Sequence, residues 1–164
     1  MYFNVFDMSN KIITPKQKYL KKVKSSFVYK INKLFSLYKS QSTKFFASEG
    51  LGYSEITTIN IMGQLGGETT LSEITSVHWI DPGLVSRISK SLEKKNLIKK
   101  IKAPKDKRSN ILVLTDKGKN IFKKIESFTS LRRRKILKHF SAPDAKKIIN
   151  LLDKLVLSTQ KEYG

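Results

Sequence analysis

The residues best suited to bind a polyanion lie on one face of a helix predicted to begin after Asp81. At 100° per residue, Val85, Ile88 and Leu92 share one arc and predict the buried side of this helix. The opposite arc carries a small residue, a hydroxyl and three cations, namely Gly83, Ser86, Arg87, Lys90 and Lys94. Insertion into the major groove of a duplex requires such a slim, hydrogen-bonding and positively charged face. An ordinary solvated helix face is the alternative interpretation.

A second cationic cluster occupies a polar loop between two β-rich segments, 97–102 and 110–114. This loop contains Lys105, Asp106, Lys107 and Arg108. An arginine at the tip of a β-hairpin can enter the narrow and electronegative minor groove. Asp106 is expected to pair with Arg108 and to fix the direction of its guanidinium. A generic basic turn is the alternative interpretation.

Two helix start signals position the first cluster. Thr70-Leu-Ser-Glu73 matches a capping box and predicts a short helix. Asp81-Pro82 predicts the start of the next helix, because aspartate accepts unpaired N–H groups and proline has none to leave unpaired. The 11-residue separation is typical of a helix-turn-helix. Asn96 tolerates the left-handed conformation and is expected to end the second helix.

The flanking segments are predicted to be helical. One long amphipathic helix is expected from Pro15 to about Phe46, and a second is expected after an N-cap at Ser54, with Ile56, Ile59 and Met62 inward and an end at Gly66-Gly67. Beyond the hairpin, Thr115 is expected to cap a helix that runs toward Leu137, and Ser141-Ala-Pro-Asp144 opens the last helix. The predicted order is α-α-α-α-β-β-α-α.

The first and last helices each carry an apolar stripe that a small domain cannot cover. We therefore expect a homodimer, in which two recognition helices would lie roughly 34 to 36 Å apart on an inverted repeat. A compact monomer with both helices folded back on the core is the alternative.

Composition narrows the function classes. The 164 residues allow one compact unit, and 33 basic against 13 acidic residues give a charge of +20, which implies a polyanionic partner. Residues 51–80 carry three acidic and no basic side chains, whereas residues 81–108 carry ten basic and three acidic ones, as expected for a core segment followed by an electrostatic face.

Several classes are not expected. The chain has no cysteine and only two, widely separated histidines, so neither a metal site nor a thiol site is expected. It has no glycine-rich phosphate loop and no nucleophile triad, so we expect no enzyme activity and no cofactor. It also has neither a readable secretory signal nor an apolar run of roughly 20 residues, so we expect no membrane span and a cytoplasmic, nucleoid-associated location.

The chain resembles the MarR family of winged helix-turn-helix transcriptional regulators, from about Thr70 to Phe122 most strongly. The resemblance is carried by Leu84-Val85-Ser86-Arg87, Ser91-Leu92-Glu93-Lys94-Lys95-Asn96-Leu97-Ile98, Asp106-Lys107-Arg108 and Leu114-Thr115-Asp116-Lys117-Gly118. It implies that Ser86 and Arg87 contact the major groove and that Arg108 is the wing's minor-groove arginine, braced by Asp106. There are three departures from the family pattern. Asn96 stands where the family usually has glycine, Pro82-Gly83 reduce base readout at the helix tip, and the charge of +20 is high for the family and favours nonspecific DNA binding.

The resemblance also implies a small aromatic effector, bound between the dimerisation helices and the DNA-binding lobe. Four aromatic residues could line such a crevice, although at helical spacing they are more often core residues: Tyr29, Tyr38, Phe45 and Trp79.

We therefore predict a mainly α chain with a small β-hairpin wing. The predicted parts are an N-terminal extension (1–14), a helical dimerisation region (15–48 and 119–164) and a winged helix-turn-helix domain (49–118). The predicted function is sequence-specific binding of double-stranded DNA as a homodimeric transcriptional regulator. A nonspecific architectural nucleic-acid-binding protein is the alternative, and a membrane-surface or protein-interaction module is a second rival.

Overall fold

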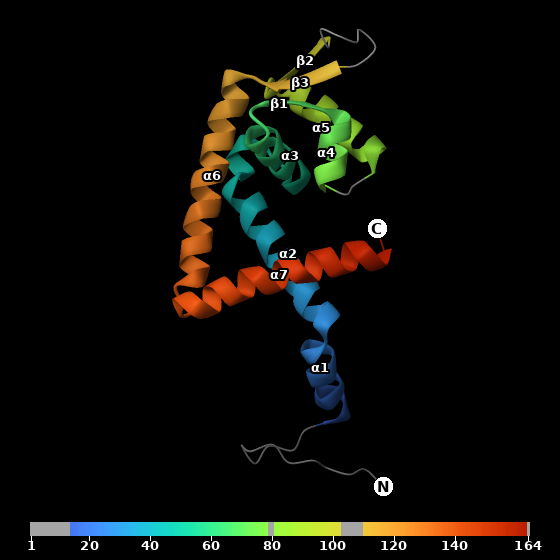
Figure 1. Cartoon of the computed structure of the whole chain (residues 1–164), viewed down its shortest axis with the longest axis vertical. Coiled ribbons are helices and arrows are strands. Elements are labelled where there is room, and N and C mark those ends of the chain that lie inside the picture. Colours follow the sequence, from blue (N-terminus) through green and yellow to red (C-terminus); the bar gives the residue numbers. More distant parts are fainter. Residues whose placement is uncertain (1–13, 79–80, 103–109, 164) are drawn as a thin grey trace. The chain divides into compact units, whose positions relative to one another are not determined.

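The computed structural model describes residues 14–78, 81–102 and 110–163 (Figure 1). Its elements, in chain order, are α1 (Pro15–Ser25), α2 (Phe27–Phe45), a 3-10 turn (Ala47–Glu49), α3 (Tyr53–Gln64), β1 (Glu68–Thr70), α4 (Leu71–His78), α5 (Pro82–Lys94), β2 (Ile98–Lys102), β3 (Asn110–Leu114), α6 (Asp116–Leu137) and α7 (Ala142–Tyr163). The chain divides into two compact units, 1–56 and 57–164. The mainly helical architecture with one small sheet confirms the predicted fold class.

The first predicted helix is wrong in one respect, because a break at Ser26 divides it into α1 and α2. Ser26 has an extended backbone, with φ −66° and ψ 144°, and its hydroxyl accepts a hydrogen bond from the Tyr29 N–H at 3.1 Å. The Ser25 hydroxyl donates to the Lys22 carbonyl at 2.8 Å. Serine side chains that bond nearby backbone groups compete with helix continuation. The apolar period runs on through the break, which is why periodicity alone did not predict it.

The start of α3 also differs from the prediction. The helix begins at Tyr53, so Ser54 lies inside it rather than at its N-cap. The Glu55 carboxylate reaches back and accepts a hydrogen bond from the Gly52 N–H at 2.9 Å. The predicted inward residues are confirmed as buried, since Ile56, Ile59 and Met62 are at most 4% exposed. The predicted end is confirmed as well, because Gly66 and Gly67 both have φ +90°.

The sheet has one strand more than the sequence predicted. Both predicted strands form, as β2 and β3, and the short strand β1 pairs with the other edge of β3 to give the antiparallel order β1-β3-β2. Leu112 on the central strand lies opposite Thr69 on one side and Lys100 on the other. At three residues, β1 is too short to show an alternating pattern.

The predicted helix-turn-helix is confirmed. The Thr70 hydroxyl accepts the Glu73 N–H at 3.2 Å, and the Glu73 carboxylate accepts the Thr70 N–H at 2.7 Å, so the capping box opens α4. Asp81 caps α5 through the Leu84 N–H at 2.9 Å. Asn96 has φ 57°, so it adopts the left-handed conformation expected after the helix end.

The start of α6 is tied to the turn between α5 and β2. Thr115 caps α6 through the Gly118 N–H at 3.1 Å, as predicted, and its hydroxyl also donates to the Asn96 carbonyl at 2.7 Å. The Lys117 ammonium donates to the Lys95 carbonyl at 3.1 Å, and the Thr115 N–H donates to the Leu97 carbonyl at 3.1 Å. These bonds join α6 to the end of α5 at the edge of the sheet, where Figure 1 shows β3 leading into α6.

Residues 57–163 have a buried apolar core that holds α5 and the sheet. The core residues come from α3, α4, α5, β2, β3 and α6, together with Leu97 directly before β2. They are Ile59, Ile61, Met62, Ile74, Val85, Ile88, Leu92, Leu97, Ile98, Leu112, Val113, Leu114, Ile121 and Ile125. The Phe122 ring lies directly against Gly63, where a β-carbon would overlap it, so α3 and α6 approach closely at this point. No helix in the described part of the chain is both long and apolar enough to cross a membrane.

Candidate nucleic-acid interface

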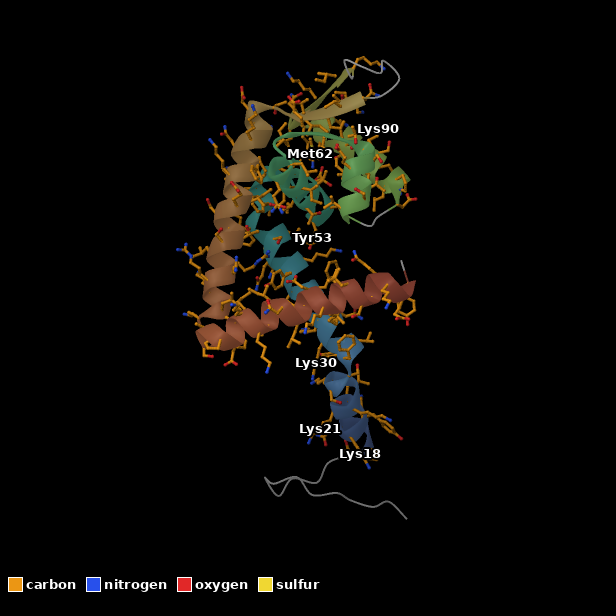
Figure 2. The ribbon with its side chains drawn as sticks, viewed as in Figure 1. Lys18, Lys21, Lys30, Tyr53, Met62 and Lys90 are labelled. Atoms are coloured by element: carbon orange, nitrogen blue, oxygen red, sulfur yellow. The ribbon has the colours of Figure 1, made fainter. Side chains whose placement is uncertain are left out.

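The α5 helix presents its cationic face to solvent. Val85 and Leu92 are completely buried and Ile88 is nearly so, which fixes the rotation of the helix about its axis. On the opposite side, Gly83, Arg87, Lys90 and Lys94 are exposed and Ser86 is half-buried. Figure 2 marks Lys90 on this helix. The five predicted positions on α5 therefore share one accessible face.

The N-terminal tip of α5 is shaped by its cap. The Asp81 carboxylate folds over the first turn, and a β-carbon at position 83 would lie 2.9 Å from the Asp81 Oδ1. Glycine at this position therefore leaves room for the cap. The tip therefore carries a carboxylate and no side chain at position 83, and Ser86 and Arg87 are the first polar side chains on the cationic face after it.

A basic strand lies beside α5 and was not predicted as part of the site. Lys99 and Lys102 on β2 are exposed. Lys100 is instead paired, because its ammonium lies 2.9 Å from the Glu93 carboxylate on α5. This ion pair joins the cationic helix to the strand that leads into the wing. The three lysines within Ile98–Lys102 were the sequence signal for this part of the surface, since a basic strand next to a basic loop extends its charge.

The tip of the predicted wing lies outside the described residues. It contains Lys105, Asp106, Lys107 and Arg108, whose predicted roles remain predictions. The strands that frame it are described, and Lys102 pairs with Asn110 at their open end. The loop from 103 to 109 therefore joins the ends of a paired hairpin, as predicted.

The other polar features near α4 are structural. The Glu73 carboxylate accepts hydrogen bonds from the Thr70 N–H, the Thr69 hydroxyl and the Thr70 hydroxyl, and these bonds hold the pKa of Glu73 below its ordinary value. The described residues contain no group of three or more histidine, aspartate or glutamate side chains that could hold a metal ion.

One shallow cavity of about 640 Å³ lies along α6. It is lined by Ser130, Arg133, Arg134 and Leu137. Its lining includes none of the described residues predicted to line an effector crevice, namely Tyr29, Tyr38 and Phe45. Tyr29, Tyr38 and Phe45 lie on α2, and Trp79 lies outside the described residues.

Residues 54–109 match the model of the MarR family, from α3 through the wing segment. A search of curated proteins found no match.

Many solved structures share the fold, and three of them illustrate the similarity. A MarR protein from Peptoclostridium difficile has a TM-score of 0.78 at 18% identity, over 84% of this chain and 90% of its own. A MarR family regulator from Listeria monocytogenes, solved with a 26mer DNA, has a TM-score of 0.77 at 20% identity, over 84% and 91%. The organohalide-sensing regulator RdhR, solved with 2,4-dichlorophenol, has a TM-score of 0.70 at 20% identity, over 87% and 80%. Residues 54–109 are thus similar to the MarR family, and the chain shares the winged-helix fold of these structures.

Proposed function

We propose that this protein is a homodimeric transcriptional regulator that binds a specific inverted repeat in double-stranded DNA. The α5 helix enters the major groove, and the wing between β2 and β3 enters the adjacent minor groove. The observation that carries this proposal is the exposed face of α5, which bears Ser86, Arg87, Lys90 and Lys94 opposite a buried stripe. The MarR-family match and the DNA held by the similar Listeria protein support the same function.

The chemistry of this face separates two roles. Ser86 and Arg87 lie one turn into the helix, where a hydroxyl and a guanidinium can reach base edges. Lys90 and Lys94 lie further along the same face and suit phosphate oxygens, which attract point charges without reading sequence. Exposed Lys99 and Lys102 on β2 extend the phosphate contacts toward the wing. In this proposal Arg108 occupies the minor groove, where it adds affinity across many sequences.

The helices outside the winged-helix domain support the homodimer. None of the residues of α7 is buried, and Leu151, Leu152, Val156 and Leu157 are 49–64% exposed. Likewise, α1 has no buried residue, although its Tyr19, Leu20 and Val23 form an apolar stripe. Such apolar surface is normally covered by a partner. A second copy provides complementary stripes, and two-fold symmetry matches an inverted repeat.

The effector and the location extend the proposal. The dichlorophenol bound by the similar RdhR protein favours a small aromatic anion as the effector class. The absence of cysteine excludes thiol oxidation as the switch in this chain. The DNA partner makes nucleoid association the expected location.

The proposal can be tested by selecting binding sites from random duplexes and measuring affinity for the selected and scrambled sequences. We expect a symmetric site that is preferred by roughly 10³-fold or more. Ser86→Ala or Arg87→Ala should narrow that preference by about 1 to 3 kcal/mol per lost base contact. Arg108→Ala should instead weaken binding to all sequences. Lys135→Ala on α6 is the control for an exposed cation outside the site.

The alternative of nonspecific architectural binding rests on the charge of +20. It predicts no preferred site and equal losses on every sequence for Ser86→Ala, Arg87→Ala and Arg108→Ala. That outcome would overturn sequence-specific recognition by α5. An asymmetric single half-site would contradict the homodimer.

A further inference from the structure

A concentration of positive charge outside the winged-helix domain lies on α1. This helix has 11 residues and carries five lysines but no acidic residue, and α2 also lacks acidic residues. Every side chain of α1 is exposed. In the described part of the chain no ion pair involves any of its lysines, which are Lys16, Lys18, Lys21, Lys22 and Lys24.

Three of these lysines share one face. At 3.6 residues per turn, Lys18, Lys21 and Lys22 lie within an arc of roughly 100°, and this arc is nearly opposite the stripe formed by Tyr19, Leu20 and Val23. The side chains of Lys18 and Lys21 extend away from the ribbon in Figure 2. The helix therefore has one face for an apolar partner and a separate face for an anion. We call Lys18, Lys21 and Lys22 the α1 lysine face.

The helix is built as a defined element despite this charge. Thr14 and Gln17 form a reciprocal capping box at its start, and the extended Ser26 ends it. Lysines three or four positions apart repel one another along a helix. A polyanion held against the lysine face would relieve that repulsion. Because their mutual repulsion is relieved together, these three lysines favour a polyanion more than isolated surface lysines do.

We propose that the α1 lysine face is an auxiliary binding surface for the phosphate backbone of duplex DNA, separate from the winged helix. The three ammonium groups arise over roughly 6 Å of helix axis. A duplex presents one phosphate per roughly 1.7 Å of its axis, so it can supply an oxyanion to each. The partner is the one in the proposed function, but the contact reads no sequence.

An anionic membrane is the other polyanion that could bind a basic amphipathic helix. A helix that lies in a bilayer interface buries its apolar stripe and keeps its cations on the polar face. Insertion of α1 would therefore bury Tyr19, Leu20 and Val23 in the lipid. The proposed homodimer needs the same stripe, so DNA is the occupant that leaves the dimer intact.

The test compares full-length protein with the triple variant Lys18→Gln/Lys21→Gln/Lys22→Gln on one random-sequence duplex over a range of salt concentrations. Each lost phosphate contact should lower the slope of log affinity against log salt by about 0.9. We expect a slope reduction of roughly 2 to 3 and a 10- to 100-fold loss of affinity at low salt. Glutamine is a good helix former, so α1 should persist, which circular dichroism checks.

Two control variants make the outcome decisive. Lys146→Gln/Lys147→Gln/Lys154→Gln removes the same charge from exposed positions on α7 and should change the slope much less. Lys18→Arg/Lys21→Arg/Lys22→Arg keeps the charge and should bind as the wild type does. If the α7 and α1 glutamine variants lose affinity and salt slope equally, net charge alone explains the effect and the proposal is overturned. An unchanged slope in the α1 glutamine variant would also overturn it.

A final arm separates DNA from lipid. Vesicles of phosphatidylcholine and phosphatidylglycerol, added at matched anionic charge, should not displace the duplex. Displacement that depends on Lys18, Lys21 and Lys22 would assign the face to membranes instead. If the α1 lysine face does not bind DNA, site selection by Ser86 and Arg87 is unaffected. If instead the α5 variants show no loss of site preference, the salt slope of the α1 variants still tests the lysine face, so the two proposals are tested separately.

Discussion

Gly118→Ala tests whether α6 is held against the turn after α5 as closely as the structure requires. A β-carbon at position 118 would overlap the Leu97 carbonyl oxygen, which is part of the turn between α5 and β2. That oxygen cannot move aside easily, because it accepts a hydrogen bond from the Thr115 N–H at 3.1 Å. Leu97 itself is buried. The substitution must therefore displace backbone rather than a flexible side chain.

Two effects of opposite sign determine how much Gly118→Ala changes the free energy of unfolding. Alanine is favoured over glycine inside a helix by about 1 kcal/mol, which alone would stabilise the protein. Overpacking a close contact costs typically 1–3 kcal/mol, and a fixed backbone carbonyl favours the upper part of that range. We expect a net loss of about 2 kcal/mol, which corresponds to a fall in Tm of roughly 4–8 °C for a chain of this size.

Differential scanning calorimetry of the wild type, Gly118→Ala and Lys123→Ala measures the effect. Lys123 is an exposed residue on the same helix, so its replacement should leave Tm nearly unchanged. A Tm for Gly118→Ala equal to or above that of the wild type would refute the close contact, because helix propensity would then be the dominant effect.

Two further predictions concern the scaffold of the same domain. Thr58 on α3 is completely buried, and its hydroxyl has no hydrogen-bond partner in the described part of the chain. Thr58→Val removes that unsatisfied group and should raise Tm by roughly 2–4 °C, or about 1 kcal/mol, whereas a lower Tm would mean that the hydroxyl is bonded. The hydrogen bonds from Thr70 and Thr69 hold the pKa of Glu73 below its ordinary value of 4.5. Glu73 therefore stabilises the fold above that pH, and this contribution is lost as the pH falls through the lowered pKa. The Tm difference between the wild type and Glu73→Gln should accordingly be present at neutral pH and shrink in acid, and a difference independent of pH would contradict the role of the carboxylate.

Local signals in the sequence determined most of the elements and the cationic face of α5. The caps at Thr70, Asp81 and Thr115 depend on hydrogen bonds within a few residues, so residue type and spacing suffice to predict them. The orientation of α5 about its axis follows from Val85, Ile88 and Leu92, because these apolar residues share one side of the helix and only that side can be buried. The Ser26 break was missed because two competing local signals, apolar periodicity and serine backbone bonding, overlap there.

Only the tertiary structure decided how these elements meet. The strand β1, the Glu93–Lys100 ion pair and the overlap that requires glycine at 118 join residues from different elements. The paired residues of β1 and β3 are far apart in the sequence, and Glu93 and Lys100 lie on a helix and a strand. A one-dimensional pattern carries no information on which strand pairs with β3 or which carbonyl lies against α6, because those choices follow from packing the whole core. The sequence therefore determined which cationic side chains α5 carries, and the tertiary structure determined which of them remain accessible on the domain.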